Sequence, residues 1–173
     1  DNARLDLTAS AVLPWVWNNA AANSTWAIGA TNWTVDGNAT GWVNGYEADF
    51  GATGAGAITV SGTNTITAMS VSADGYSFSG GTLALGSAET ALAISNATTV
   101  ASTIAGSNAL VKTGGSTLTL SGANSYSGGT TLSNGVLHLE HVSAAGTGTI
   151  TQSDDTSTIE IDTTGTVANA MDF

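Results

Sequence analysis

The feature that most constrains this chain is a series of short segments in which apolar residues alternate with small or polar ones, mostly Ser and Thr. An alternation with a period of two places one set of side chains on each face of a β-strand. Gly or Asn soon interrupts each segment, and no stretch shows a helical period of 3.6 residues. An all-β fold is therefore predicted, and its clearest segments are 58–60, 69–71, 76–78, 83–85, 92–94, 118–120, 137–139 and 159–161.

Many short strands fit either an antiparallel sandwich or barrel, or a solenoid. Gly-Gly pairs recur before Leu-bearing strands, at 80–81, 114–115 and 128–129, which favours the solenoid. The strands are also shorter than the usual five or six residues. The expected corners carry Asn, a residue that suits the left-handed backbone positions of tight turns. These corner residues are Asn108, Asn124 and Asn134.

A solenoid buries the inward residues of each coil against the equivalent residues of the next coil. We therefore expect parallel stacked strands around one continuous core, to which each buried aliphatic side chain contributes roughly 1.5–3 kcal/mol. The residues expected to point into this core are Leu118, Leu120, Leu132, Leu137, Leu139, Ile150, Ile159 and Ile161.

The charge composition excludes several partners. Only Arg4 and Lys112 are basic, against 13 acidic residues, which gives a net charge of −11. Because nucleic-acid binding needs clustered Lys and Arg, we expect no nucleic-acid partner. Anionic membrane surfaces are disfavoured for the same reason. The chain has no Cys, which excludes disulfides, thiolate metal sites and Cys nucleophiles.

One segment carries a specific resemblance. Residues 109–139 closely resemble the passenger-associated repeat of bacterial autotransporters, with its Leu–Lys–Thr–Gly–Gly type of start, its Thr-Leu-Thr-Leu-Ser-Gly-Ala-Asn core and its Gly-Gly-Thr-Thr turn. The matching residues are Leu110, Lys112, Gly114, Gly115, Leu118, Leu120, Gly122, Asn124, Tyr126, Gly128, Gly129, Thr130, Leu132, Gly135, Leu137 and Leu139. The Trp-rich region that ends near Phe50 resembles, more loosely, the segments that precede such repeats.

The resemblance implies a right-handed parallel β-helix that is secreted or displayed on the bacterial cell surface. In that family the repeat supports passenger folding and transport, and we expect no catalytic role and no cofactor. The resemblance implies an outer-membrane β-barrel as a partner only where a longer precursor exists. We interpret the chain as a fragment or processed passenger, or as a soluble relative without a barrel.

The composition changes near residue 51. We predict a Trp-rich cap or entry region over residues 1–50 and β-helix coils over 51–173, with the passenger-associated repeat at 109–139. The five tryptophans form the main binding candidate, because exposed rings could stack on sugars. The alternative is an aromatic cap over the first coil, since an open coil is an unpaired edge. These residues are Trp15, Trp17, Trp26, Trp33 and Trp42.

Two polar groups are weaker candidates. His138 and Glu140 share one strand face while His141 points away, so no complete metal-ligand set is visible. Acidic residues gather at Asp154-Asp155, where the flanking Ser and Thr indicate a turn, and at Glu160 and Asp162, which alternate with isoleucines. We expect neither a metal site nor catalytic residues here, although a weak Ca²⁺ site and a carboxylate pair for glycoside hydrolysis are the alternatives.

Two functions remain. The first is a structural stalk or fibre segment that associates through the ends of the β-helix, because no cap is visible over 163–173. The second is an adhesin-type module that recognises a glycan or host surface through the Trp-rich region. An enzyme is a distant third.

Overall fold

The strands are short and follow one another closely along the chain. The computed structural model describes residues 13–173, and within this range there are seventeen strands. None of the described segments is a helix long and apolar enough to cross a membrane. The strands are β1 (Trp15–Trp17), β2 (Thr25–Trp26), β3 (Trp33–Val35), β4 (Asn38–Thr40), β5 (Tyr46–Phe50), β6 (Ala57–Val71), β7 (Ser77–Leu85), β8 (Glu89–Ile94), β9 (Thr98–Val100), β10 (Thr103–Ala105), β11 (Ala109–Thr113), β12 (Thr117–Leu120), β13 (Thr130–Leu132), β14 (Val136–Leu139), β15 (Ile150–Gln152), β16 (Thr158–Ile161) and β17 (Met171–Asp172).

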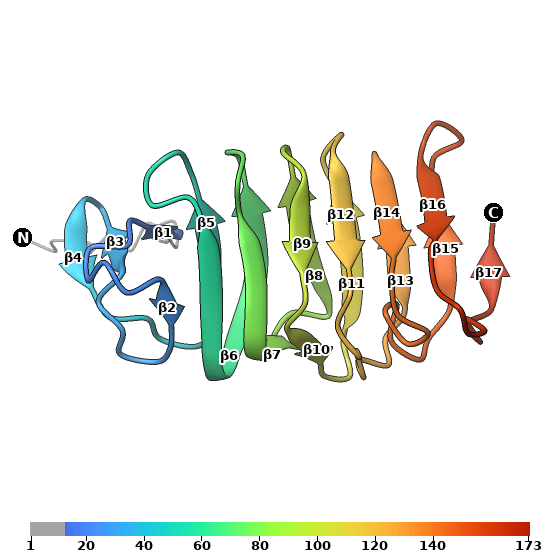
Figure 1. The fold of residues 1–173 in the computed structure, drawn as a ribbon, viewed down its shortest axis with the longest axis horizontal. Coiled ribbons are helices and arrows are strands. Elements are labelled where there is room, and N and C mark those ends of the chain that lie inside the picture. The colour runs from blue at the N-terminus through green and yellow to red at the C-terminus, as the bar shows by residue number, and fades with distance from the viewer. Residues whose placement is uncertain (1–12) are drawn as a thin grey trace, which may run out of the picture.

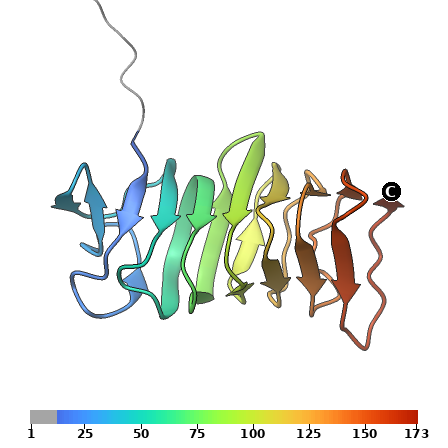
Figure 2. The ribbon, with the colours of Figure 1, turned by 90° about the horizontal axis from the view of Figure 1, so that it is seen from above.

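Apart from β3 and β4, these strands stack in parallel as the walls of a coil that advances along one axis (Figures 1 and 2). The first wall runs from β1 and β5 through the end of β6 to β8, β11, β13, β15 and β17. The second wall runs from β2 through the starts of β6 and β7 to β9, β12, β14 and β16. A third wall is formed by the middle of β6, the end of β7, and β10. The predicted all-β parallel β-helix is thus confirmed.

The alternating sequence explains the register of the walls. Along the second wall, Phe78 pairs with Val100, Val100 lies beside Leu120, and Leu120 beside Leu139, so the same inward position is apolar from coil to coil. All four side chains are buried. The residues that precede Val100 and Leu120 on their strands, Thr99 and Thr119, point outward. One-residue slips would turn every apolar side chain to solvent, so the alternation fixes which face is the core.

The predicted core is largely correct. Six of the eight residues, Leu118, Leu120, Leu132, Leu137, Leu139 and Ile150, are fully buried. Ile159 is only partly buried, and the prediction for Ile161 is wrong, because this side chain is 47% exposed. Both lie on β16, which pairs with β14 on one side and with no strand on the other within the described residues.

The three predicted corner asparagines do lie between strands, but the left-handed backbone expected for them is wrong. Among the described residues, the non-Gly residues with a positive φ are Asn19, Ala22, Ser24 and Asp36, and none of the three is among them. Asn108 and Asn124 instead act through their side chains. The Asn108 amide donates to the carbonyl of Leu85 at 2.8 Å, which links one coil to the previous one.

The N-terminal end departs from the parallel pattern. β3 and β4 form an antiparallel hairpin, and β3 also pairs antiparallel with β1. β1 and β5 nevertheless pair in parallel, so coil-type pairing already begins before residue 51. Residues 1–12 of the predicted cap region, including Arg4, lie outside the described residues.

The wall geometry gives a stability prediction for β12. Replacing Leu120, which is fully buried, with alanine should lower the free energy of unfolding by about 2–5 kcal/mol, since it removes core contacts and leaves a cavity. The matched control is Ser121→Ala, which should change it by less than about 0.5 kcal/mol because that side chain lies outside the core. Urea unfolding followed by circular dichroism measures both. Equal midpoints for the two variants would mean that the inward face is misassigned.

Candidate functional site

The five tryptophans lie inside the N-terminal end of the coil (Figure 1). Together with Tyr46, Phe50, Tyr76 and Phe78 they form what we call the aromatic cluster. Strand positions with alternating burial bring them inward: Trp15 and Trp17 both point to the core side of β1. Trp26 is central, with ring centroids 5.1 Å from Trp42, 5.2 Å from Trp33 and 5.3 Å from Phe50. Many of these contacts are edge-to-face or tilted, the geometries that aromatic rings prefer.

The burial of these rings bears directly on the binding hypothesis. Trp17, Trp26, Trp33 and Trp42 are fully buried, and Trp15 is 8% exposed. Stacking on a sugar requires an open ring face, and none of the five residues offers one in this packing. The indoles of Trp26, Trp33 and Trp42 contribute apolar packing only, because their N–H groups have no hydrogen-bond acceptor among the described residues. The packing therefore favours the aromatic cap over a Trp-based glycan site.

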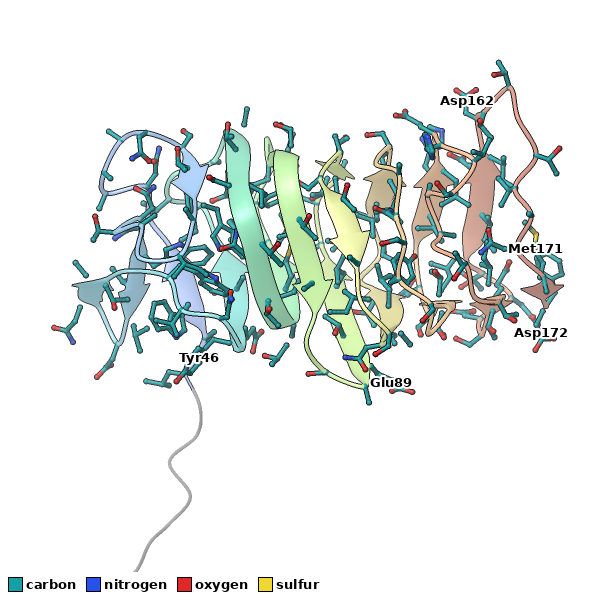
Figure 3. All side chains as sticks on the ribbon, turned by 90° about the horizontal axis from the view of Figure 1, so that it is seen from below. Tyr46, Glu89, Asp162, Met171 and Asp172 are labelled. Atoms are coloured by element: carbon teal, nitrogen blue, oxygen red, sulfur yellow. The ribbon has the colours of Figure 1, made fainter. Side chains whose placement is uncertain are left out.

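The exposed large apolar side chains occur only towards the two ends of the described chain. Near the N-terminal end they are Leu13, Ile28 and Val43, and near the other end Val142, Ile161, Met171 and Phe173. Figure 3 labels Met171 on the last strand, beside Asp172. Ile28 and Val43 flank a paired segment, in which the Gly29 N–H donates to the carbonyl of Trp42 at 2.8 Å. Between Val43 and Val142 no large apolar side chain is exposed.

The histidines and Glu140 lie on β14 and in the loop after it. Among the described residues there is no group of three His, Cys, Asp or Glu side chains that could hold a metal ion. His138 is half-buried on β14 and Glu140 is exposed after it. The Nδ1 of His141 lies 2.9 Å from the Oγ of Ser143 and accepts the Ser143 N–H at 3.1 Å, so it stabilises its own loop.

The acidic candidates are turn and surface residues. The Asp154 carboxylate accepts hydrogen bonds from the N–H and the hydroxyl of Thr156, both at 2.9 Å. These bonds lower the pKa of Asp154 and stabilise the turn that the sequence predicts. Glu160 and Asp162 are exposed on the outward face of β16 and just after it.

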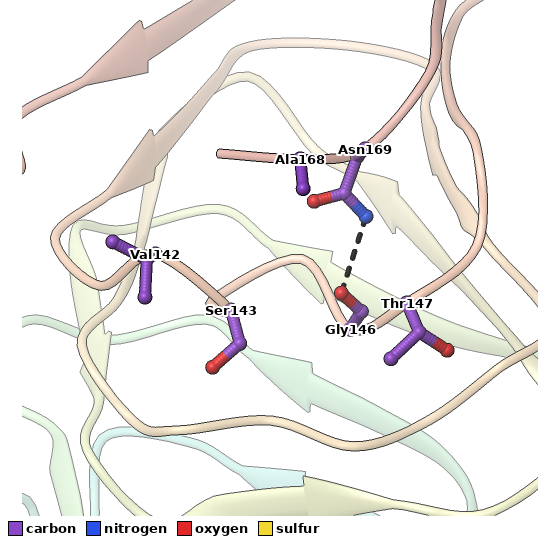
Figure 4. A pocket seen from close by; sticks show the side chains of 6 residues that line it. All are labelled: Val142, Ser143, Gly146, Thr147, Ala168 and Asn169. Atoms are coloured by element: carbon purple, nitrogen blue, oxygen red, sulfur yellow. Dashed lines mark hydrogen bonds between the residues drawn. The ribbon is translucent and has the colours of Figure 1, made fainter. Parts of the chain in front are cut away.

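A pocket lies between the loop at 142–147 and residues 168–169 (Figure 4). Its main polar side chain is Asn169, whose amide donates to the carbonyls of Gly146 at 3.1 Å and Gly148 at 2.7 Å. The amide N–H groups of Asn169 are therefore used to hold the last coil in place.

The most unusual side chain of the coil is Lys112, whose role the sequence analysis missed. It is fully buried, and it occupies an inward row of the first wall between Leu92 and Leu132. Its Nζ donates to three backbone carbonyls: Thr113 at 2.9 Å, Gly114 at 2.6 Å and Asn134 at 3.0 Å. The sequence could have indicated this burial, because Lys112 lies two residues after Leu110 on β11 and therefore points to the same inward face.

Asn124 provides a second link between coils. Its Oδ1 accepts the N–H of Ile104 at 2.7 Å, and its amide donates to the carbonyl of Ala144 at 2.6 Å. Each partner lies twenty residues away along the chain, one in the coil before and one in the coil after. Such buried and fully paired polar groups stabilise one arrangement of the coils.

These buried groups predict an unusual alkaline profile. Burial lowers the pKa of Lys112 from 10.5 to about 8, so between these values the unfolded chain holds a proton that the folded chain has lost. Stability should therefore rise with pH over this window, by at most about 1.4 kcal/mol per pH unit. Burial raises the pKa of Tyr126 above its usual value. Burial, with a smaller effect from Asp49, raises the pKa of Tyr76 to about 12. Above pH 10 the unfolded tyrosines lose protons that the folded ones keep, and stability should fall.

Urea unfolding between about pH 7 and pH 12 measures this profile. Lys112→Met should abolish the rising limb, and Tyr126→Phe should make the falling limb shallower. A wild-type profile that falls steadily from pH 8 would contradict the prediction.

The comparisons with known proteins agree with this architecture. Residues 110–139 match the family described as the passenger-associated-transport-repeat. Over 133 residues the chain is 36% identical to the adhesin BmaC autotransporter of Brucella suis biovar 1 (strain 1330). That alignment covers 75% of this chain and 4% of the relative, so the chain spans only a small part of the relative's length. No solved structure matches the chain.

The parallel walls, the single core and the coil-to-coil links of Lys112 and Asn124 define a parallel β-helix. Within it, residues 110–139 are a passenger-associated transport repeat, and three quarters of the chain are similar to part of an autotransporter adhesin. The resemblance found in the sequence at 109–139 is thus confirmed.

Proposed function

We propose that this chain is a non-catalytic length of passenger β-helix that acts as a stalk or fibre segment at the bacterial surface or after secretion. The observation that carries the proposal is the unbroken parallel pairing from β5 to β17 around one core. A wall of this kind holds its two ends at a fixed separation, because each coil is hydrogen-bonded to the next. The autotransporter relative supports the surface or secreted location.

The stalk associates through its ends. Within residues 13–173, strand β16 pairs only with β14, and the apolar side chains of Ile161 on β16, of Met171 on β17 and of Phe173 after it are exposed. An edge with free N–H and C=O groups and apolar neighbours is a template for another strand. The net charge of −11 opposes lateral contacts along the sides, so growth along the axis is favoured.

Small-angle scattering and electron microscopy test this proposal. The chain should give an elongated particle whose longest dimension increases with concentration, while its cross-section stays constant. Ile161→Lys should reduce this growth, and Thr119→Lys, which places the same charge on the side of the second wall, serves as the control. A compact particle that stays monomeric at high concentration and high salt would overturn end-to-end association.

The second candidate is an adhesin-type binding module, and two observations favour it. The relative is an adhesin by name, and the exposed apolar residues Ile28 and Val43 each adjoin one member of the hydrogen-bonded pair Gly29 and Trp42, of which Trp42 belongs to the aromatic cluster. Exposed apolar side chains that lie together are more often functional than scattered ones. Glycan-array and host-cell binding of the wild type should be lost in Ile28→Ser/Val43→Ser and kept in Ser121→Ala. Binding that survives the double substitution would place the contact surface elsewhere.

A further inference from the structure

The alternating sequence that builds the walls leaves one ambiguity. A slip of one residue turns the core side chains outward, whereas a slip of two residues keeps every apolar side chain inward. Segments such as Thr117-Leu118-Thr119-Leu120 repeat the same pair of residue types, so hydrophobic burial alone does not distinguish the native register from a two-residue slip. Another interaction must distinguish them.

Lys112 supplies an interaction that depends on register. β11 ends at Thr113 and β13 ends at Leu132, so the turns after both strands lie one above the other. The Lys112 ammonium bridges these turns, because it binds the carbonyls of Thr113 and Gly114 in its own coil and that of Asn134 in the next. Burial is the cause that lowers the pKa of Lys112, and no carboxylate of the described residues contributes to it. The hydrogen-bond partners of the ammonium are the three backbone carbonyls.

A two-residue slip removes this environment. It displaces the next coil by about 6.6 Å along the strand, and the Asn134 carbonyl then moves out of reach. The ammonium would remain buried beneath a Leu-rich core with only its own coil to bind. An incompletely paired buried charge is strongly unfavourable, whereas a hydrophobic residue in the same place would tolerate the slip.

We propose that Lys112 is a register lock: its buried ammonium selects the alignment of the β11 coil with the β13 coil, a selection that the alternating apolar residues cannot make. The lock is built from one side chain and two stacked turns. It requires no ligand and does not depend on which function the stalk serves.

The chain contains no Cys, which allows the register to be read by engineered disulfides. Val111 and Thr131 are direct partners on the outward face, so Val111→Cys/Thr131→Cys reports the native register. Val111→Cys/Ser133→Cys reports the slip, because these Cα atoms are about 8 Å apart in the native register and cannot form a disulfide without movement. Each pair is placed in the wild-type background and with Lys112→Met, and the oxidised fraction is measured by thiol titration and peptide mapping.

With Lys112 present, only the native pair should oxidise. With Lys112→Met the slipped pair should oxidise to a fraction of the same order as the native pair, while the circular dichroism spectrum keeps its β-sheet form. Leu132→Met, a change in the same inward row without loss of charge, is the control and should show the native pair only. Lys112→Leu, which continues the row of Leu92 and Leu132, provides a second variant without the charge.

Two results would overturn the proposal. One is a folded Lys112→Met or Lys112→Leu chain in which the slipped pair never oxidises. The other is the loss of β-sheet structure in both variants, because Lys112 would then be needed for folding as such and not for the choice of register.

Discussion

Replacing Trp26 with alanine should lower the free energy of unfolding by about 3–5 kcal/mol, the range found for large aromatic residues in a core. Trp26 is fully buried and lies close to four other aromatic rings, including Phe78 of β7 at 6.2 Å between centroids. The loss should appear as a lower urea midpoint measured by circular dichroism. Near-ultraviolet circular dichroism should also lose much of its intensity, because the remaining indoles would no longer be held in fixed orientations.

Ile28→Ala is the matched control for this experiment. Ile28 lies two residues further along the chain, but its side chain is 62% exposed, so its truncation should cost less than about 0.5 kcal/mol. A Trp26→Ala chain as stable as this control would show that the aromatic cluster does not close the core. Because Trp26→Ala is expected to destabilise the fold, a loss of glycan binding in this variant could result from unfolding alone. The binding test therefore uses substitutions of exposed residues.

The walls could be predicted from the sequence because their signal is local. The alternation in segments such as Leu118-Thr119-Leu120 fixes the inward face of each strand, and Gly-Gly pairs mark the corners. Leu118 and Leu120 are buried as expected. The Gly-Gly pairs and the short strands favoured a solenoid among the all-β folds that the same pattern allows, and the family resemblance at 109–139 implied a parallel β-helix.

What could not be predicted depends on contacts between coils. The backbone of Asn124 does not adopt the predicted left-handed conformation, and its side chain instead joins Ile104 to Ala144. Ile161 repeats the core pattern but has no further strand over it within the described residues. The antiparallel β3–β4 hairpin has no counterpart in the alternating segments. Lys112 follows the alternation of inward and outward side chains along β11, yet its burial contradicts the usual preference of lysine for solvent.

The close approach of coils at their corners leads to the last prediction. Replacing Gly114 with alanine should cost about 2–5 kcal/mol, as the sum of a left-handed backbone and an overpacked contact. The φ of Gly114 is +80°, and an added Cβ would collide with the backbone of Ile94 in the coil below. Gly115 lacks a left-handed φ, and a Cβ there would meet no heavy atom within 4 Å, so Gly115→Ala should leave the urea midpoint nearly unchanged. Equal destabilisation by the two substitutions would mean that this corner responds to lost backbone freedom and not to coil spacing. A large effect at Gly114 alone would show that the first glycine of the pair in the repeat sets how closely two coils can stack.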